Sequence, residues 1–377
     1  MTDEPLTDVA LNRALLARQG LLEPLDLPLV EAVETVGALQ AQHWPAPPFA
    51  LASRVKGFAV ADLYAALDGG KLVTGTLIRT TLHLVSAREH AAYATVAAEV
   101  ASWQRSKAEA GDDAHGLLTD LIAYAKRTPR SGEDIAEFAE AWVKEHPKAL
   151  PRDEVKAQRD RKWRPLMRWH GFVRVPGDGE WGSKAPGALR AAPRPRRALK
   201  VEAALDEVVR RHLRAFGPAG PEDVANWINW KPKPVREAFA RLESELVGLE
   251  SEHGRALYDL PDAPRPDPEA EAPPRLLAPF DSVLLAYAPK RRARILPDKH
   301  RDSVYERANL RVLPTYLIDG RVAGTWGTEV KRGEVALTLS PLEKLPRGSK
   351  TALIEEAERV LPAVQPEAKG HRAVVAR

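Results

Sequence analysis

The chain has 377 residues, no cysteine and a net charge of +4. Without cysteine it has no disulfides, no thiolate nucleophile and no metal site with cysteine ligands. It contains no apolar run of about eighteen residues, and its N-terminus does not resemble a secretory signal, so we expect a cytoplasmic protein without a membrane span. Its length is enough for about two to four domains.

The charge is unevenly distributed. Residues 152–200 contain 14 Lys/Arg against 5 Asp/Glu, and residues 290–311 contain 8 against 3. Residues 243–271 reverse the balance, with 9 acids and two arginines. Basic blocks of this kind are typical of proteins that bind the phosphate backbone of a nucleic acid, and ordinary solvated surface is the alternative.

The first predicted helix leads to two glutamines. Leu29, Val33 and Val36 have the spacing of a buried helical stripe, and Gln40 falls at its next position. Because three prolines follow, we expect the chain to leave the helix at Gln40–Gln42 and become extended, so that both amides share a face. A buried amide needs hydrogen-bond partners. The pair therefore either ties a helix end to its neighbour or converges on a ligand.

Residues 60–86 predict a helix, a Gly-Gly stop and an alternating strand. In the strand LIRTTLHLVS, Arg79, Thr81 and His83 share one face. Such a face can line a cleft, although a lone histidine in a strand is more often structural. These three residues are therefore candidates for lining a site, and so is His43, which directly follows Gln42.

Residues 131–182 predict two helices followed by a hairpin, an order similar to that of residues 217–259 below. Ser131 predicts the cap of a helix, with Asp134 at the capping-box position. The segment RDEVKAQRDRKWRPLMRWHG predicts a basic helix kinked at Pro165, and FVRVPGDGEWG predicts a hairpin around Gly-Asp-Gly.

Residues 217–259 predict a helix, a turn, a second helix and a β-hairpin, which is the order of a winged helix. The Pro-rich stretches 186–200 and 260–276 are typical of linkers. We therefore expect an α+β chain with three tandem winged-helix units, at 1–128, 129–198 and 199–272, and a β-rich part at 273–377. The repeat is one of pattern only, since no sequence identity links the units.

The last part opens with PFDSVLLAY, an apolar strand that leads into a basic loop. Asp281 precedes this strand, either as a turn cap or as a site residue. Arg291, Arg292 and Arg294 are expected to contact phosphates, because a guanidinium binds them bidentately, and an exposed basic loop is the alternative. Further on, Asp-Gly in LIDGRVAGTW predicts a hairpin turn.

Several common kinds of site are not indicated. No GxxxxGK[ST], GxGxxG or GxSxG motif is present, which argues against nucleotide hydrolysis, NAD chemistry and a serine hydrolase. His43, His170 and His300 lack HxH or HExxH spacing, so we expect no metal site and no cofactor.

Five motifs, in this order, resemble the AlkZ/YcaQ family of winged-helix DNA glycosylases: LQAQ, RTTLHLVSAREH, FGPAGPEDVANW, PFDSVLLAY and LIDGRVAGTW. The resemblance covers nearly the whole chain. It implies three tandem winged helices and a β-rich part that form a concave DNA-binding surface. Gln40-Ala41-Gln42 matches the Gln-x-Gln form of the AlkZ-like branch, with Gln40 and Gln42 as catalytic residues. Ala41 is smaller than the apolar residue expected there.

The resemblance implies a monofunctional glycosylase that hydrolyses N7-alkylated purines, extending to interstrand crosslinks, in DNA repair or in self-resistance to an alkylating natural product. Its partner is then double-stranded DNA that carries alkylated bases, with the protein a monomer at the nucleoid. The DNA-binding candidates are Lys162, Arg164, Arg168, Arg291, Arg292 and Arg294. The alternatives are a non-catalytic winged-helix regulator or lesion-sequestering protein, and an RNA binder, which lacks support because no RNP motif is present.

Overall fold

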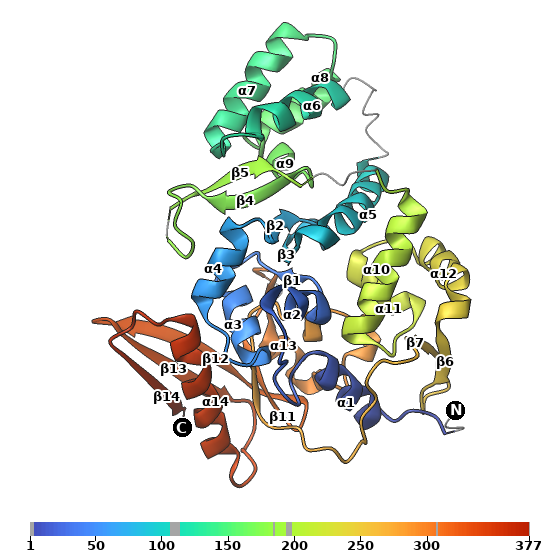
Figure 1. The fold of residues 1–377 in the computed structure, drawn as a ribbon, viewed down its shortest axis with the longest axis vertical. Helices are drawn as coiled ribbons and strands as arrows, with labels where there is room; N and C mark the ends of the chain where they lie inside the picture. The colour runs from blue at the N-terminus through green and yellow to red at the C-terminus, as the bar shows by residue number, and fades with distance from the viewer. Residues whose placement is uncertain (1–3, 106–113, 184, 194–197, 307, 377) are drawn as a thin grey trace. The chain divides into compact units, whose positions relative to one another are not determined.

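The computed structural model describes residues 4–105, 114–183, 185–193, 198–306 and 308–376 (Figure 1). The chain forms two compact units: residues 1–69 with 206–377 make the first, and residues 70–205 make the second. Both contain helices and sheets, so the α+β class is confirmed. The first unit is assembled from two segments that lie far apart in the sequence, whereas the second is continuous. The four predicted domains have other boundaries and stay a prediction.

The N-terminal segment of the first unit is mainly helical. The Thr7 hydroxyl caps its first helix by accepting the Ala10 N–H at 3.1 Å. Two prolines open the third helix, where the missing N–H groups would have had no helical acceptor. The elements are α1 (Asp8–Arg18), α2 (Leu29–Val36), β1 (Leu39–Gln40), α3 (Ala46–Arg54) and α4 (Val60–Asp68).

The predicted helix, turn, helix and hairpin at residues 217–259 are confirmed. Val224, Trp227 and Ile228 are buried, as their helical spacing predicts. Gly254, with φ of 69°, sits in the hairpin turn. The elements are α10 (Val201–Phe216), α11 (Pro221–Ile228), α12 (Pro232–Arg241), a 3-10 turn (Glu243–Glu245), β6 (Val247–Glu250) and β7 (Ala256–Asp259).

The C-terminal part of the first unit is a sheet of order β14-β13-β12-β11-β8, in which only β13 and β14 run parallel among the described pairs. The predicted Asp-Gly turn is confirmed: Asp319 (φ 49°) and Gly320 (φ 72°) connect two of its strands. The strands are β8 (Arg275–Leu277), β11 (Thr315–Ile318), β12 (Arg321–Lys331), β13 (Glu334–Pro341) and β14 (Gly370–Val375).

A helix that the sequence patterns do not predict, α14 (Ser349–Val364), lies against this sheet and against α3 (Figure 1). Ser53 of α3 donates to Glu356 at 3.1 Å, and Arg359 donates to the Ala52 carbonyl at 2.8 Å. These contacts, the first buried and the second partly buried, join the two segments of the first unit. The smaller elements of this part are 3-10 turns (Ser282–Leu284, Pro289–Arg291 and Asp298–His300), α13 (Arg301–Val304), β9 (Tyr305–Glu306) and β10 (Arg311–Val312).

The second unit has strands in the order β3-β2-β4-β5 and five helices among its described residues. The predicted Ser131–Asp134 capping box is confirmed, with hydrogen bonds of 3.0 and 2.7 Å. The apolar core collects Leu121, Trp142 and Phe172 from helices and a strand. The elements are β2 (Leu72–Thr76), β3 (Leu82–Ser86), α5 (Ala87–Arg105), α6 (Ala114–Ala125), α7 (Gly132–Glu145), α8 (Arg152–Asp160), α9 (Arg164–Met167), β4 (Phe172–Pro176) and β5 (Gly187–Ala191).

The basic segment after Arg152 is not one kinked helix, as predicted, but two helices separated by a left-handed turn. Lys162 and Trp163 have φ of 52° and 57°. The turn brings the Trp163 ring into the core, where the indole N–H donates to Glu140 at 2.8 Å. Pro165 lies in the first turn of α9, where proline is compatible with a helix.

The hairpin predicted around Gly-Asp-Gly is also longer than expected. β4 pairs with β5, so the second strand falls within the stretch predicted as a linker. Residues 194–197 of that linker lie outside the described residues. In contrast, the Pro-rich stretch from 260 contains no helix and no strand until β8 begins at Arg275, as predicted.

Candidate active site

The Gln-x-Gln motif follows α2 after a sharp change of backbone direction. The helix ends at Val36 and not at Gln40 as predicted, because Gly37 takes φ of 80°. A Cβ atom at Gly37 would lie 3.1 Å from the Ala215 Cβ, so glycine is required both by conformation and by space. Gln40 is then on the short strand β1, already extended, and not on the helical stripe.

The two glutamines differ in exposure. Gln40 is 8% exposed and Ala41 is 4% exposed, whereas Gln42 lies on the surface. The predicted burial of Gln40 is therefore confirmed. Within three residues, the amide of Gln40 is therefore buried and that of Gln42 is exposed to solvent. This arrangement suits a fixed amide beside one that reaches a ligand.

Two buried side chains hold the backbone on either side of Gly37. The Gln19 amide donates to the carbonyls of Val36 at 3.0 Å and Ala215 at 2.9 Å. The Ser282 hydroxyl donates to the Ala38 carbonyl at 3.1 Å. The strand that carries Gln40 thus starts from a backbone fixed by two hydrogen bonds, each from a residue distant in the sequence.

A buried ion pair supports both Gln19 and the turn that contains Ser282. Arg54 donates to both carboxylate oxygens of Asp281 at 2.8 and 3.0 Å, and both side chains have 0% exposure. Arg54 also donates to the Gln19 amide oxygen at 3.3 Å, and Asp281 caps the turn that contains Ser282 by accepting the Val283 N–H. Asp281 is therefore the turn cap of the two alternatives considered for it, and the structure gives it a supporting position.

His43 follows the motif directly and is exposed at the surface. Partial desolvation of its ring lowers the pKa of His43, and the positive charge of Arg311 lowers it further. Its imidazole is therefore neutral at physiological pH. A neutral ring can accept a proton or a hydrogen bond beside the glutamines, so His43 stays a site-lining candidate.

The segment with Arg79, Thr81 and His83 is not one continuous strand. Ile78–Thr80 form a 3-10 turn between β2 and β3, with Arg79 at φ of 53° and Thr80 at φ of 55°. The prediction of one alternating strand face is therefore wrong, because a left-handed turn ends the alternation before β3 begins. That these residues border the same cleft as the glutamines stays a prediction.

His83 is a buried residue of the second unit, with 1% exposure. Burial lowers the pKa of His83 to about 3, with a smaller contribution from the charge of Arg79. Its Nδ1 lies 3.0 Å from the Thr81 carbonyl, which can only accept, so the neutral ring donates from Nδ1. This geometry agrees with a structural role for His83.

The arginines at 291–294 are engaged within the protein. Arg291 forms ion pairs with Asp223 and, at 3.5 Å, with Glu222. Arg292 donates to the Tyr287 carbonyl at 2.8 Å. Arg294 is 8% exposed and donates to Asn12 at 2.7 Å. A buried guanidinium is not available to a phosphate, so the structure corrects the prediction of a DNA contact at Arg294.

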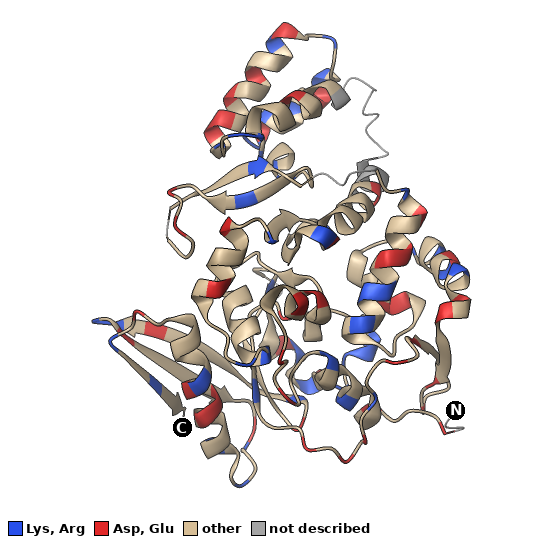
Figure 2. Ribbon diagram, viewed as in Figure 1, with Lys and Arg blue, Asp and Glu red and all other residues tan. Residues whose placement is uncertain are grey.

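The candidates in the second unit differ from these arginines in exposure. Figure 2 marks the lysines and arginines of the chain in blue and its acidic residues in red. Lys162, Arg164 and Arg168 are exposed on and beside α9. Arg164 and Arg168 line a pocket together with Arg161, which the sequence predictions do not single out. These residues are available to an external partner.

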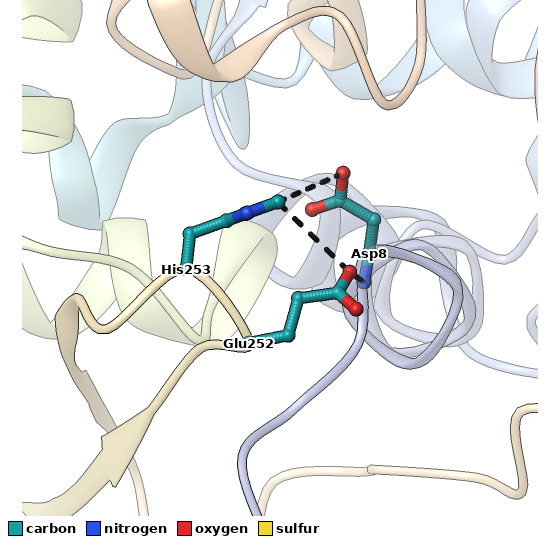
Figure 3. A group of neighbouring side chains, drawn as sticks. All are labelled: Asp8, Glu252 and His253. Atoms are coloured by element: carbon teal, nitrogen blue, oxygen red, sulfur yellow. Dashed lines mark hydrogen bonds and ion pairs between the residues drawn. The ribbon is translucent and has the colours of Figure 1, made fainter.

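One group of described side chains offers the ligand types of a metal site: Asp8, Glu252 and His253 (Figure 3). Glu252 accepts the Asp8 backbone N–H at 2.6 Å, and the His253 Nε2 lies 3.5 Å from an Asp8 carboxylate oxygen. Glu252 therefore helps to cap α1 from the hairpin turn between β6 and β7. That role explains the cluster without an ion.

No helix within the described ranges has the length and apolar character required to cross a membrane.

Known proteins resemble the chain over nearly its whole length. The Interstrand DNA cross-link repair glycosylase of Streptomyces sahachiroi is 27% identical, over 87% of this chain and 90% of that protein. The solved structure of Streptomyces sahachiroi DNA glycosylase AlkZ has a TM-score of 0.78 at 21% identity, and the match covers 98% of this chain and 100% of that one. At that identity the structural likeness establishes the fold. The family model described as DNA glycosylase AlkZ-like matches residues 33–363, and the chain therefore belongs to the AlkZ-like family of DNA glycosylases.

Proposed function

We propose that the protein hydrolyses the N-glycosidic bond of purines alkylated at N7 in double-stranded DNA, with Gln40 and Gln42 positioning the attacking water. The observation that carries this proposal is the held Gln-x-Gln segment: a buried and an exposed amide, two residues apart, on a backbone fixed by Gln19 and Ser282. Such fixed polar groups are what a site needs to orient a small nucleophile.

The chemistry suits amides because the leaving base is already cationic. When the bond from C1′ to the purine nitrogen breaks, its electron pair neutralises the alkylated base. The water oxygen forms the new bond to C1′, and one water proton passes to solvent. Amide oxygens orient that water by accepting its hydrogens. The products are the free base and an abasic site, with no covalent enzyme intermediate.

Glutamine gives this site a limited range. A carboxylate would stabilise the positive charge that develops on the sugar, whereas an amide contributes only a dipole. We therefore expect a modest rate enhancement and a restriction to lesions with weakened bonds. Since the Streptomyces sahachiroi relative is named for interstrand cross-link repair, we propose that crosslinked purines are included. We propose that the protein acts in DNA repair or in self-resistance to a DNA-alkylating natural product.

We further propose that α11, α12, β6 and β7 form the third of three winged helices on a concave DNA-binding surface. The helix–turn–helix–hairpin order of these elements supports this assignment. Among the predicted DNA contacts, Lys162, Arg164 and Arg168 are exposed and stay in the proposed set.

Release of 7-methylguanine from an alkylated duplex tests the proposed function. The purified protein should release the base and leave an uncut abasic strand, detected only after alkaline cleavage. Binding of the alkylated duplex without base release would instead support a lesion-sequestering protein. Strand cleavage without alkali would reject the water mechanism.

A further inference from the structure

A pocket of about 630 Å³ lies in the second unit beside the turn between α8 and α9. Its walls come from the end of β2, the Ile78–Thr80 turn, α5 and the segment after α8. Arg161, Arg164 and Arg168 line it together with Trp169 and His170. Three guanidinium groups around one hollow make it a cationic pocket.

These positive charges are not neutralised from within. Two acids of the same unit have other partners: Glu140 binds Arg159 at 2.6 Å, and Glu154 accepts from Gln158 at 2.7 Å. Across the described part of the chain, no carboxylate lies within ion-pair distance of Arg161, Arg164 or Arg168. A hollow with three such groups is a favourable place for an anion.

Arg174 on β4 is partly buried and does not line the pocket, but it is close enough to Arg168 for the two positive charges to repel each other. Burial lowers the pKa of Arg174, and the positive charge of Arg168 lowers it further. Its Nε atom is buried and has no hydrogen-bond partner among the described residues. Two arginines placed close together at a cost in desolvation are stabilised when an anion supplies the missing negative charge.

Two left-handed turns lie next to residues that line the pocket. Thr80 and Arg79 form one, and Lys162 and Trp163 form the other. Backbone of this kind is unfavourable for residues other than glycine and persists at ligand clamps when the surroundings hold it. Here the Trp163 N–H donates to the Gln158 carbonyl at 2.8 Å, so Arg161 and Arg164 stand on either side of a fixed turn.

We propose that this pocket binds one phosphate group of a DNA strand. The arginines hold its non-bridging oxygens, while Leu77, Pro165 and Trp169 provide apolar contact for the adjoining sugar. The volume is in the range of pockets that enclose one small ligand. The inference rests on the proposed function, since it takes DNA as the partner, and it identifies a discrete contact in place of a diffuse basic surface.

The test uses duplexes in which a single phosphate is replaced by an uncharged methylphosphonate, at one position after another. Affinity is measured by fluorescence anisotropy for the wild-type protein and for Arg164→Gln/Arg168→Gln. One position should lower wild-type affinity roughly tenfold, and the double variant should be insensitive to that position. The slope of log affinity against log salt should also become shallower by about 1 for each phosphate that the variant no longer neutralises.

Arg127→Gln is the matched control, because Arg127 is an exposed arginine of the second unit outside the pocket. It should keep the wild-type profile. Should thermal melting show that the double variant is misfolded, Arg161→Gln alone replaces it. A methylphosphonate profile of equal shape in wild-type and pocket variant overturns the proposal.

A competition arm separates DNA from a small anion. Two results together would also overturn the DNA assignment. Inorganic phosphate would raise the melting temperature of the wild type but not of the variant, and no methylphosphonate position would specifically lower DNA affinity. Base release by the wild type is measured on the same duplexes. Absent release would reject the proposed function, whereas the methylphosphonate profile would still decide the pocket.

Discussion

Two segments rich in arginine, residues 161–168 and 291–294, have similar local composition but opposite surroundings. In the second segment, Arg291 meets Asp223 and Arg294 meets Asn12. In the first, the arginines face a pocket without a carboxylate among the described residues. A local excess of basic residues shows only that positive charge is present. The acids that neutralise it come from distant parts of the chain.

Charged side chains accordingly have two different roles in this protein. Around the Gln-x-Gln motif, ionised groups such as Arg54 and Asp281 are buried and satisfied, and they fix the backbone. In the pocket of the second unit, the charged groups are exposed, so a ligand from outside can reach them. Loss of a charge should therefore impair folding in the first region and binding in the second.

The largest effect is expected for Asp281→Ala. It leaves Arg54 buried without its carboxylate, and breaking a buried ion pair costs about 3–5 kcal/mol. Urea unfolding of this variant should show that loss, whereas Arg164→Gln should change stability by less than about 0.5 kcal/mol. Equal losses in both variants would remove the distinction between the regions.

Next in size is the loss of either of the two amides proposed to be catalytic. Gln40→Ala and Gln42→Ala should each lower base release at saturating DNA by ~10²–10³, because each removes one positioned polar group at the transition state. DNA affinity should stay at the wild-type value. The double variant should lose less than the product of the two single losses, since in the proposed mechanism both residues position the same water. Full activity in both single variants would contradict the assignment.

Acid should destabilise the second unit through its buried histidines. Burial lowers the pKa of His83 to about 3 and that of His90 to about 4. The unfolded chain, with a histidine pKa near 6.5, binds more protons below that pH, so stability falls as the pH drops from 6.5 towards 4. Between pH 6.5 and 5 the loss is about 2 kcal/mol for each histidine.

His90→Gln tests this, with exposed His253→Gln as its control. Urea unfolding at pH 7.5 and pH 5.0 should show a smaller acid effect in the first variant only. An unchanged difference between the two pH values would show that His90 is already protonated in the folded protein.

A smaller effect is expected for Ser282→Ala, which removes the hydrogen bond to the Ala38 carbonyl ahead of the motif. One such bond contributes about 1 kcal/mol, so base release at saturating DNA should slow roughly fivefold. Affinity for DNA should not change. A fall in affinity with an unchanged rate would mean that Ser282 supports binding and not the glutamines.

The smallest effect is expected for Arg291→Gln/Arg292→Gln. Their charges are engaged inside the first unit, so DNA affinity should change less than about twofold and its salt dependence should be unchanged. Thermal melting should nevertheless show some destabilisation. A loss of affinity as large as in the pocket variant would contradict the comparison of the two arginine segments.

Local signals in the sequence predict local structure here. The helices and hairpin of residues 217–259 and the Asp319–Gly320 turn follow from apolar spacing, proline and glycine. The burial of Gln40 is predicted from the helical stripe of α2 and is found, although Gln40 lies on β1 beyond the end of that helix. The end of α2 could also be predicted from the sequence, because a glycine such as Gly37 commonly terminates a helix.

Features that depend on distant partners were not predictable. The break at Lys162–Trp163 exists because Trp163 reaches the core and Glu140. Gln19 and Ser282 are ordinary polar residues until the fold brings them to Val36 and Ala38. Polar residues beside apolar helices, such as Gln19 after α1, are the one signal that could have singled them out.

The two-segment construction of the first unit has a consequence for biosynthesis. Ser53 and Ala52 leave the ribosome about 300 residues before their partners on α14. At roughly 5–20 residues per second, the N-terminal helices wait on the order of 15–60 s for those partners. The continuous second unit is complete well before then. Newly made chains should therefore acquire the arginine pocket during translation and complete the fold around the glutamines only near its end.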